Sequence, residues 1–161
     1  MLNRLPKIET QQHDPIDSAE RIIAEMPNPP EIQYEGTKAF YSPVADRITL
    51  PCRELFVTAT ELYATAFHEI CHAAGHPTRL NRSSINDSAP FGSASYATEE
   101  LIAEMGAACL CAEAGISPAL LDNQAAYING WLGKLRNDKR LVVIAAAQAQ
   151  KTADYLLRVT D

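Results

Sequence analysis

The sequence predicts an α+β domain in which a small three-stranded antiparallel sheet is followed by a helical bundle. Short extended segments separated by turn residues fill residues 31–51, and long segments with helical periodicity follow from residue 58 onward. A length of 161 residues and a hydrophobic content of 47% are typical of one packed domain. A core of that size is stable without metal ions or disulfide bonds. A bound metal would therefore serve catalysis and not folding.

The first elements lie before the sheet. Residues 1–15 are polar and have no periodic apolar pattern, so we expect an arm or linker ahead of a domain over residues 16–161. A short helix is expected over residues 17–26, where Ile22 and Ile23 supply an apolar side. The prolines that follow Met26 end this helix.

Three extended segments come next, at residues 32–34, 39–41 and 47–50. Turn residues separate them, first around Gly36 and then at residues 43–46. Strands joined by such short turns usually form antiparallel hairpins. We therefore expect a three-stranded antiparallel meander.

The rest of the chain is predicted to be helical, apart from a polar loop over residues 76–95. Thr58 and Glu61 form a capping box at the start of the first long helix. Gly75 and Gly115 lie where left-handed C-terminal caps are expected. The expected helices are 58–74, 96–114, 118–121, 123–136 and 140–158.

Charge argues against a nucleic-acid protein. The formal net charge of −6 repels a phosphate backbone on average. The basic cluster of Lys134, Arg136, Lys139 and Arg140 is typical of a solvated helix end. DNA binding by this chain alone is therefore not expected.

Cysteine usage and hydropathy predict a cytoplasmic protein with no membrane partner. The four cysteines form no CxxC pair, and no secretory signal opens the sequence. No apolar run approaches the roughly 18 to 20 residues that a membrane-spanning helix needs. The sequence carries no signal for a particular oligomeric state.

The motif that carries chemistry is His68-Glu69-Ile70-Cys71-His72, in the middle of the first long helix. Residues four positions apart share a helix face, so both imidazoles can reach one metal ion. Glu69 lies one position off that line, where its carboxylate can reach a metal-bound water without displacing a ligand. We therefore predict His68 and His72 as metal ligands and Glu69 as the catalytic base. The alternative, two packed histidines beside an exposed glutamate, is disfavoured by the agreement of the local helix signals.

A hydrolytic zinc site keeps three protein ligands and one open position, so a third ligand is needed. Glu100 and Glu104 share one face of the next long helix, and we assign Glu100 as the ligand and Glu104 as the carboxylate that orients a histidine ring. Glu99 lies off this face and is interpreted as a favourable acid near the helix start. Glu104 and His76 are the alternative ligands, but a helix that ends at Gly75 turns His76 away from the site.

One zinc ion per chain is the expected cofactor, although two imidazoles and a carboxylate also suit manganese or iron. The substrate of such a site would be a protein or peptide. Its tetrahedral oxyanion needs a hydrogen-bond donor, and Tyr96, His76 and Arg79 are the candidates nearest in sequence to the ligands.

Several unusual strings occur in order along nearly the whole chain: Ala39-Phe-Tyr-Ser-Pro, Asp46-Arg-Ile, Phe67-His-Glu-Ile-Cys-His-Ala-Ala-Gly-His, Arg79-Leu-Asn-Arg82, Phe91-Gly-Ser, Tyr96-Ala-Thr-Glu-Glu-Leu-Ile-Ala-Glu104, Ala126-Tyr-Ile, Trp131-Leu, Ala147-Gln-Ala-Gln150 and Asp154-Tyr155. Together they resemble the zincin-like metallopeptidase domain at the C-terminus of ArdC-type antirestriction proteins and related plasmid and phage proteins. The resemblance implies a zincin fold, a metal bound by two histidines and a helical glutamate, and a mobile-element context concerned with protecting incoming DNA.

Fuller members of that family also carry an N-terminal single-stranded-DNA-binding domain, which the matching strings do not include. DNA binding and antirestriction activity are therefore not carried over. The expected function is a zinc-dependent peptidase of antirestriction type that acts on an unknown protein. The alternatives are a non-catalytic, metal-stabilised module that binds DNA or protein, and a fold retained with an inactive site.

Overall fold

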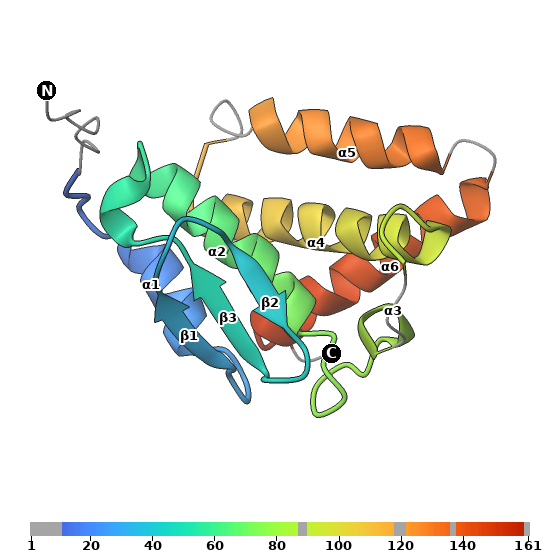
Figure 1. Ribbon diagram of the computed structural model, residues 1–161, viewed down its shortest axis with the longest axis horizontal. Coiled ribbons are helices and arrows are strands. Elements are labelled where there is room, and N and C mark those ends of the chain that lie inside the picture. Colours follow the sequence, from blue (N-terminus) through green and yellow to red (C-terminus); the bar gives the residue numbers. More distant parts are fainter. Residues whose placement is uncertain (1–10, 87–89, 118–121, 136–137, 160–161) are drawn as a thin grey trace, which may run out of the picture.

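The computed structural model describes residues 11–86, 90–117, 122–135 and 138–159. The elements in chain order are α1 (Asp17–Ala24), β1 (Glu31–Tyr34), β2 (Phe40–Ser42), β3 (Arg47–Leu50), the 3₁₀ helix η1 (Arg53–Leu55), α2 (Ala59–Ala73), α3 (Ser83–Asn86), α4 (Ala94–Glu113), α5 (Asp122–Lys134) and α6 (Lys139–Leu156). A small sheet followed by a helical bundle confirms the predicted α+β class (Figure 1).

The three strands form a mixed sheet in the order β1-β3-β2. β2 and β3 are antiparallel, with Tyr41 opposite Ile48, whereas β1 runs parallel to β3, with Ile32 opposite Ile48. The predicted antiparallel meander is therefore wrong for β1. The chain continues beside β3 as far as Glu35, whose N–H donates to the Leu50 carbonyl, and then crosses to the other edge of the sheet.

Burial explains why β3 is the central strand. Ile48, Thr49 and Leu50 are buried, whereas every residue of β1 and β2 is at least partly exposed. The strand with the most buried apolar surface gains most from having a neighbour on both sides. The pattern of short extended segments carries no information about which strands are neighbours, and the turn signals alone favoured the simpler meander.

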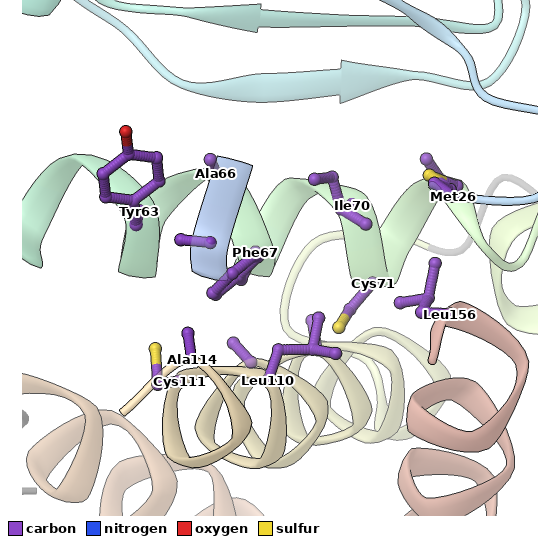
Figure 2. Packing of buried hydrophobic residues seen from close by; sticks show 14 of the residues in the cluster. Met26, Tyr63, Ala66, Phe67, Ile70, Cys71, Leu110, Cys111, Ala114 and Leu156 are labelled. Carbon is purple, nitrogen blue, oxygen red and sulfur yellow. The ribbon is translucent and has the colours of Figure 1, made fainter. Parts of the chain in front are cut away.

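The long helices pack in layers against the sheet (Figure 1). α2 contacts β2 and β3 as well as α4, and α4 in turn contacts α5 and α6. Figure 2 shows the core between α2 and α4, where Phe67 and Cys71 of α2 are directed toward α4 close to Leu110. One face of α2 is thus fixed in the core, which leaves another face for the HExxH side chains.

A second apolar cluster covers another side of α4. Ala97, Leu101 and Ile102 pack there with Leu135, at the end of α5, and with Ala149 of α6. Side chains on most of the circumference of α4 therefore lie inside the protein. This burial decides the surroundings of the three glutamates in its first half.

The predicted helix boundaries agree with the structure to within a few residues. α2 begins as predicted, because the Thr58 hydroxyl accepts a hydrogen bond from the Glu61 N–H at 3.1 Å. α3 was not predicted and lies inside the loop expected over residues 76–95. The short helix expected at residues 118–121 lies outside the described residues.

Of the two glycine caps, only the one at Gly115 is confirmed. Its φ of +73° is left-handed, whereas Gly75 is not among the residues with positive φ. A Cβ at Gly75 would lie 2.9 Å from the guanidinium carbon of Arg82 and 2.8 Å from a side-chain carbon of Ile85. Glycine is needed at this position because the Arg82 side chain passes close to the backbone.

Residues 11–15 of the predicted arm contain no helix or strand, and residues 1–10 lie outside the described residues. Among the helices that the structure describes, none has the length and hydropathy needed to cross a membrane.

Candidate metal centre

The two histidines of the HExxH motif lie one turn apart on α2 and converge. Their ring centroids are 4.7 Å apart, and their Nε2 atoms are 3.1 Å apart. Phe67 and Ile70 anchor the same helix turn in the core, which fixes the direction of both rings. His72 is 9% exposed, and His68 is partly exposed toward a cleft. Both imidazoles therefore present the same nitrogen to one point.

Glu100 on α4 completes a group of three ligand side chains. Its carboxylate oxygens lie 3.6 Å from His68 Nε2 and 3.5 Å from His72 Nε2. A tetrahedral zinc ion with ligand bonds of about 2.0 to 2.1 Å holds its donor atoms about 3.3 Å apart, which matches these separations. Within the described ranges, no other group of three or more such side chains is close enough to share a metal. The donor set therefore fits a metal ion in both chemistry and spacing.

Glu69 borders the same site but is not part of the ligand group. It faces a cleft of about 740 Å³ that lies between β2 and the start of α4. Burial raises the pKa of Glu69 above its ordinary value, against the opposing effect of the two histidines, and the Tyr41 backbone N–H donates a hydrogen bond to the carboxylate. A carboxyl group with a raised pKa beside an open cleft is suited to accept and return a proton.

Glu104 lies one turn beyond Glu100 and approaches the opposite side of the His68 ring. Its Oε1 is 3.4 Å from His68 Nδ1, and its side chain is buried. An Nδ1–H directed at a carboxylate fixes the tautomer that leaves Nε2 free for a metal. This placement is the one that the predicted role of Glu104 requires.

Glu99 is the site residue that the sequence prediction missed. It is 4% exposed, and its Oε1 lies 3.1 Å from His72 Nδ1. Arg82 donates hydrogen bonds to both of its oxygens, at 2.6 and 3.0 Å, and the Ser84 hydroxyl donates another at 2.5 Å. Burial alone would raise the pKa of Glu99, but the hydrogen bonds from His72 and Arg82 lower it to about 2. Glu99 is therefore an ionised carboxylate that orients His72, and its interpretation as an acid near the helix start was wrong.

One signal in the sequence could have identified this role. The segment that follows Glu99 and Glu100 is apolar on every face, from Leu101 to Ala103 and again around Gly106. Such a pattern indicates a helix buried on all sides. An acid in a helix of this kind needs a partner even when it points away from its neighbouring acids.

Two of the three predicted oxyanion donors line the cleft. Tyr96 lies at the cleft wall, and its hydroxyl donates a hydrogen bond to Glu100. His76 also lines the cleft, but its Nδ1 is 2.9 Å from the Thr78 hydroxyl and it is not part of the ligand group. Tyr96 is thus the donor nearest to the metal ligands.

Arg79 has a structural role instead. Its side chain is fully buried and forms an ion pair with Asp46, and it also donates to the Tyr41 hydroxyl and to the Ala73 carbonyl. These contacts hold the β2–β3 turn, in which Asp46 has a φ of +47°, against the end of α2. The prediction that Arg79 is an oxyanion donor is wrong, because its hydrogen-bonding groups are already engaged within the fold.

Separate substitutions of Glu100 and Glu104 are expected to distinguish the metal ligand from the residue that orients a histidine ring. Glu100→Ala should abolish stoichiometric metal binding, since one of three ligands is lost. Glu104→Ala should weaken the affinity about 10- to 100-fold, because a histidine ring loses its hydrogen-bond partner. Elemental analysis of dialysed protein and competition with a chelator would measure both effects. Equal and negligible effects would contradict the assignment and indicate His76 as the third ligand.

Comparison with known proteins identifies the family to which the chain belongs. Residues 17–148 match the protein family described as zincin-like metallopeptidase. The protein y4eC of Sinorhizobium fredii is 38% identical over 141 residues, which cover 88% of this chain and 44% of that protein. The DNA primase TraC of Escherichia coli is 38% identical over 161 residues, which cover 97% of this chain and 14% of the primase. The chain thus spans less than half the length of these two relatives.

Two solved structures of the antirestriction protein ArdC from the R388 plasmid are also similar. The Mn(II)-bound structure has 36% sequence identity and a TM-score of 0.69, over 97% of this chain and 56% of the ArdC chain. The metal-free structure has 37% identity and a TM-score of 0.68, over 94% of this chain and 53% of the ArdC chain. These matches confirm the resemblance drawn from the sequence strings. By its sequence, its fold and its donor set, the chain belongs to the zincin-like metallopeptidase family.

Proposed function

We propose that this protein is a zinc-dependent peptidase that hydrolyses peptide bonds of a protein substrate. The observation that carries the proposal is the position of Glu69, a buried carboxyl group on the wall of an open cleft beside three converging ligands. Metal binding alone needs His68, His72 and Glu100 and has no use for Glu69 as a general base.

In this proposal, each step of the reaction is assigned to particular residues of the chain. A divalent ion held by His68, His72 and Glu100 would polarise the scissile carbonyl and make a water more acidic. Glu69 accepts the proton of the attacking water and passes it to the leaving amine. The Tyr96 hydroxyl, which shares the cleft wall, would turn from Glu100 to donate its hydrogen bond to the oxyanion once Glu100 binds the metal.

The position and lining of the cleft favour a polypeptide substrate. It opens along β2, which is an edge strand of the sheet. Its rim carries the apolar side chains of Phe40 and Val44, which are 48% and 101% exposed. An extended segment with apolar side chains would bury these groups on binding. The four free cysteines agree with a cytoplasmic reaction.

The names of the relatives support a mobile-element context for the proposal. ArdC is an antirestriction protein, and TraC is a DNA primase. A peptidase of this type would remove a host or element-encoded protein that interferes with incoming DNA. Masking of DNA by this chain itself is disfavoured by the net charge of −6.

Zinc-loaded protein incubated with a proteome-derived peptide mixture is expected to generate new N-termini that mass spectrometry can identify. These cleavages should disappear with a chelator and return when zinc is restored, because the reaction depends on the bound ion. Cleavage by the manganese-loaded protein would show whether manganese, the metal in the related ArdC structure, also supports catalysis here. A chain that binds a stoichiometric metal ion yet cleaves nothing would instead support a non-catalytic binding module.

A further inference from the structure

A buried arginine that does not line the cleft contacts Glu99, the carboxylate beside the metal ligand His72. Arg82 is 6% exposed and lies between α2 and α3. Its guanidinium donates to three elements of the fold at once: to Glu99 on α4, to the Thr152 hydroxyl on α6 at 3.0 Å, and to the Cys71 carbonyl on α2 at 2.6 Å. Three helices that are distant in sequence are therefore joined through one side chain.

The contact with Glu99 connects this arginine to a metal ligand. Two nitrogens of Arg82 bind the two oxygens of Glu99, which is the forked geometry typical of arginine with a carboxylate. One of these oxygens also lies 3.1 Å from His72 Nδ1. The position of the guanidinium therefore fixes the carboxylate, and the carboxylate fixes the plane of the His72 ring.

The surrounding structure is adapted to hold the guanidinium in this place. Gly75 leaves the space it occupies, since a Cβ there would lie 2.9 Å from both Cζ and one terminal nitrogen of Arg82. Thr152 is fully buried on α6, and its hydroxyl both donates to the Gln148 carbonyl and accepts from Arg82. A substitution at either position would displace the guanidinium without touching Glu99 or His72.

We propose that Arg82 is a positioning residue for the metal centre: it acts through Glu99 to hold His72 in the orientation that binds metal, and it couples metal affinity to the packing of α6. The inference rests on the metal site of the proposed function but not on peptidase activity. It predicts that changes at Gly75, whose N–H donates to the His72 backbone carbonyl at 2.9 Å, and at Thr152 on α6 weaken metal binding through Arg82.

The test compares zinc dissociation constants, measured by chelator competition, for Arg82→Lys, Gly75→Ala and Thr152→Val. We expect Arg82→Lys and Gly75→Ala to weaken zinc binding about 10- to 100-fold, as loss of a partner behind a ligand does. Lysine keeps the charge but cannot form the fork. Thr152→Val removes one hydrogen bond to Arg82 and should have a smaller effect in the same direction.

A matched control separates positioning from loss of stability. Tyr63→Phe removes a hydrogen bond of 2.6 Å to Glu20 in the first half of α2, whereas Arg82 contacts the end of that helix at Cys71. This change should lower the unfolding temperature without changing the zinc dissociation constant. The visible spectrum of the cobalt-substituted protein should change in the Arg82, Gly75 and Thr152 variants and remain constant in Tyr63→Phe.

The proposal is overturned if folded Gly75→Ala and Thr152→Val proteins bind zinc within twofold of the wild type. Thr152→Val keeps the test decisive should the Arg82 variant fail to fold, because the replacement has nearly the same shape. Failure of the proposed peptidase function is a separate outcome. In that case the wild type would cleave no peptide, while zinc affinity would still depend on Arg82.

Discussion

Glu69→Gln is expected to lower the rate of peptide hydrolysis by about 10²- to 10⁴-fold, which is the usual contribution of a general base. The amide of glutamine has nearly the same shape as the carboxyl group but cannot take a proton from water. Because Glu69 is outside the ligand group, the variant should still bind a stoichiometric metal ion. Loss of activity with unchanged metal content would identify Glu69 as a catalytic residue.

The measurement combines turnover of a cleaved peptide with elemental analysis of the same preparations. Glu113→Gln provides the control, since Glu113 is an exposed acid at the end of α4, and this variant should match the wild type in both respects. Wild-type activity in Glu69→Gln would refute the proposed mechanism. If Glu69→Gln lost its metal as well, the residue would have to be reassigned as a ligand.

Glu99→Ala is expected to destabilise the folded protein by about 3 to 5 kcal/mol, the usual effect of breaking a buried ion pair from one side. The reason is that Arg82 would remain buried with its main anionic partner gone. His72 would lose its hydrogen-bond partner at the same time, so metal binding should also weaken. The same change at an exposed acid normally alters stability by less than about 0.5 kcal/mol.

Urea unfolding of the metal-free protein, with Glu113→Ala as the surface control, would measure this difference. A double-mutant cycle with Arg82→Met would isolate the coupling between the two side chains, because removing both avoids leaving one charge unpaired. We expect the double variant to be more stable than Glu99→Ala alone. Additive effects of the two single changes would contradict the buried pair described above.

The fold class and the positions of the long helices were determined by local sequence features. The start of α2 follows from the hydroxyl of Thr58, which satisfies a free N–H of the first turn whatever the rest of the chain does. The convergence of His68 and His72 follows from helix geometry alone, because residues four apart share a face. Glu100 could be placed in the same way once its helix was recognised.

Tertiary packing decided the features that the sequence did not predict. The parallel pairing of β1 with β3 depends on which strand is buried, and the roles of Gly75 and Glu99 depend on where the Arg82 side chain lies. Each of these contacts joins residues that are far apart in sequence or lie on different elements, so no local periodicity encodes them. The helix that carries the two histidine ligands could be predicted from the sequence because its capping and spacing signals lie within that one helix. Glu99 and Arg82, the buried charges that orient His72, became apparent only when α2, α4 and α6 were packed together.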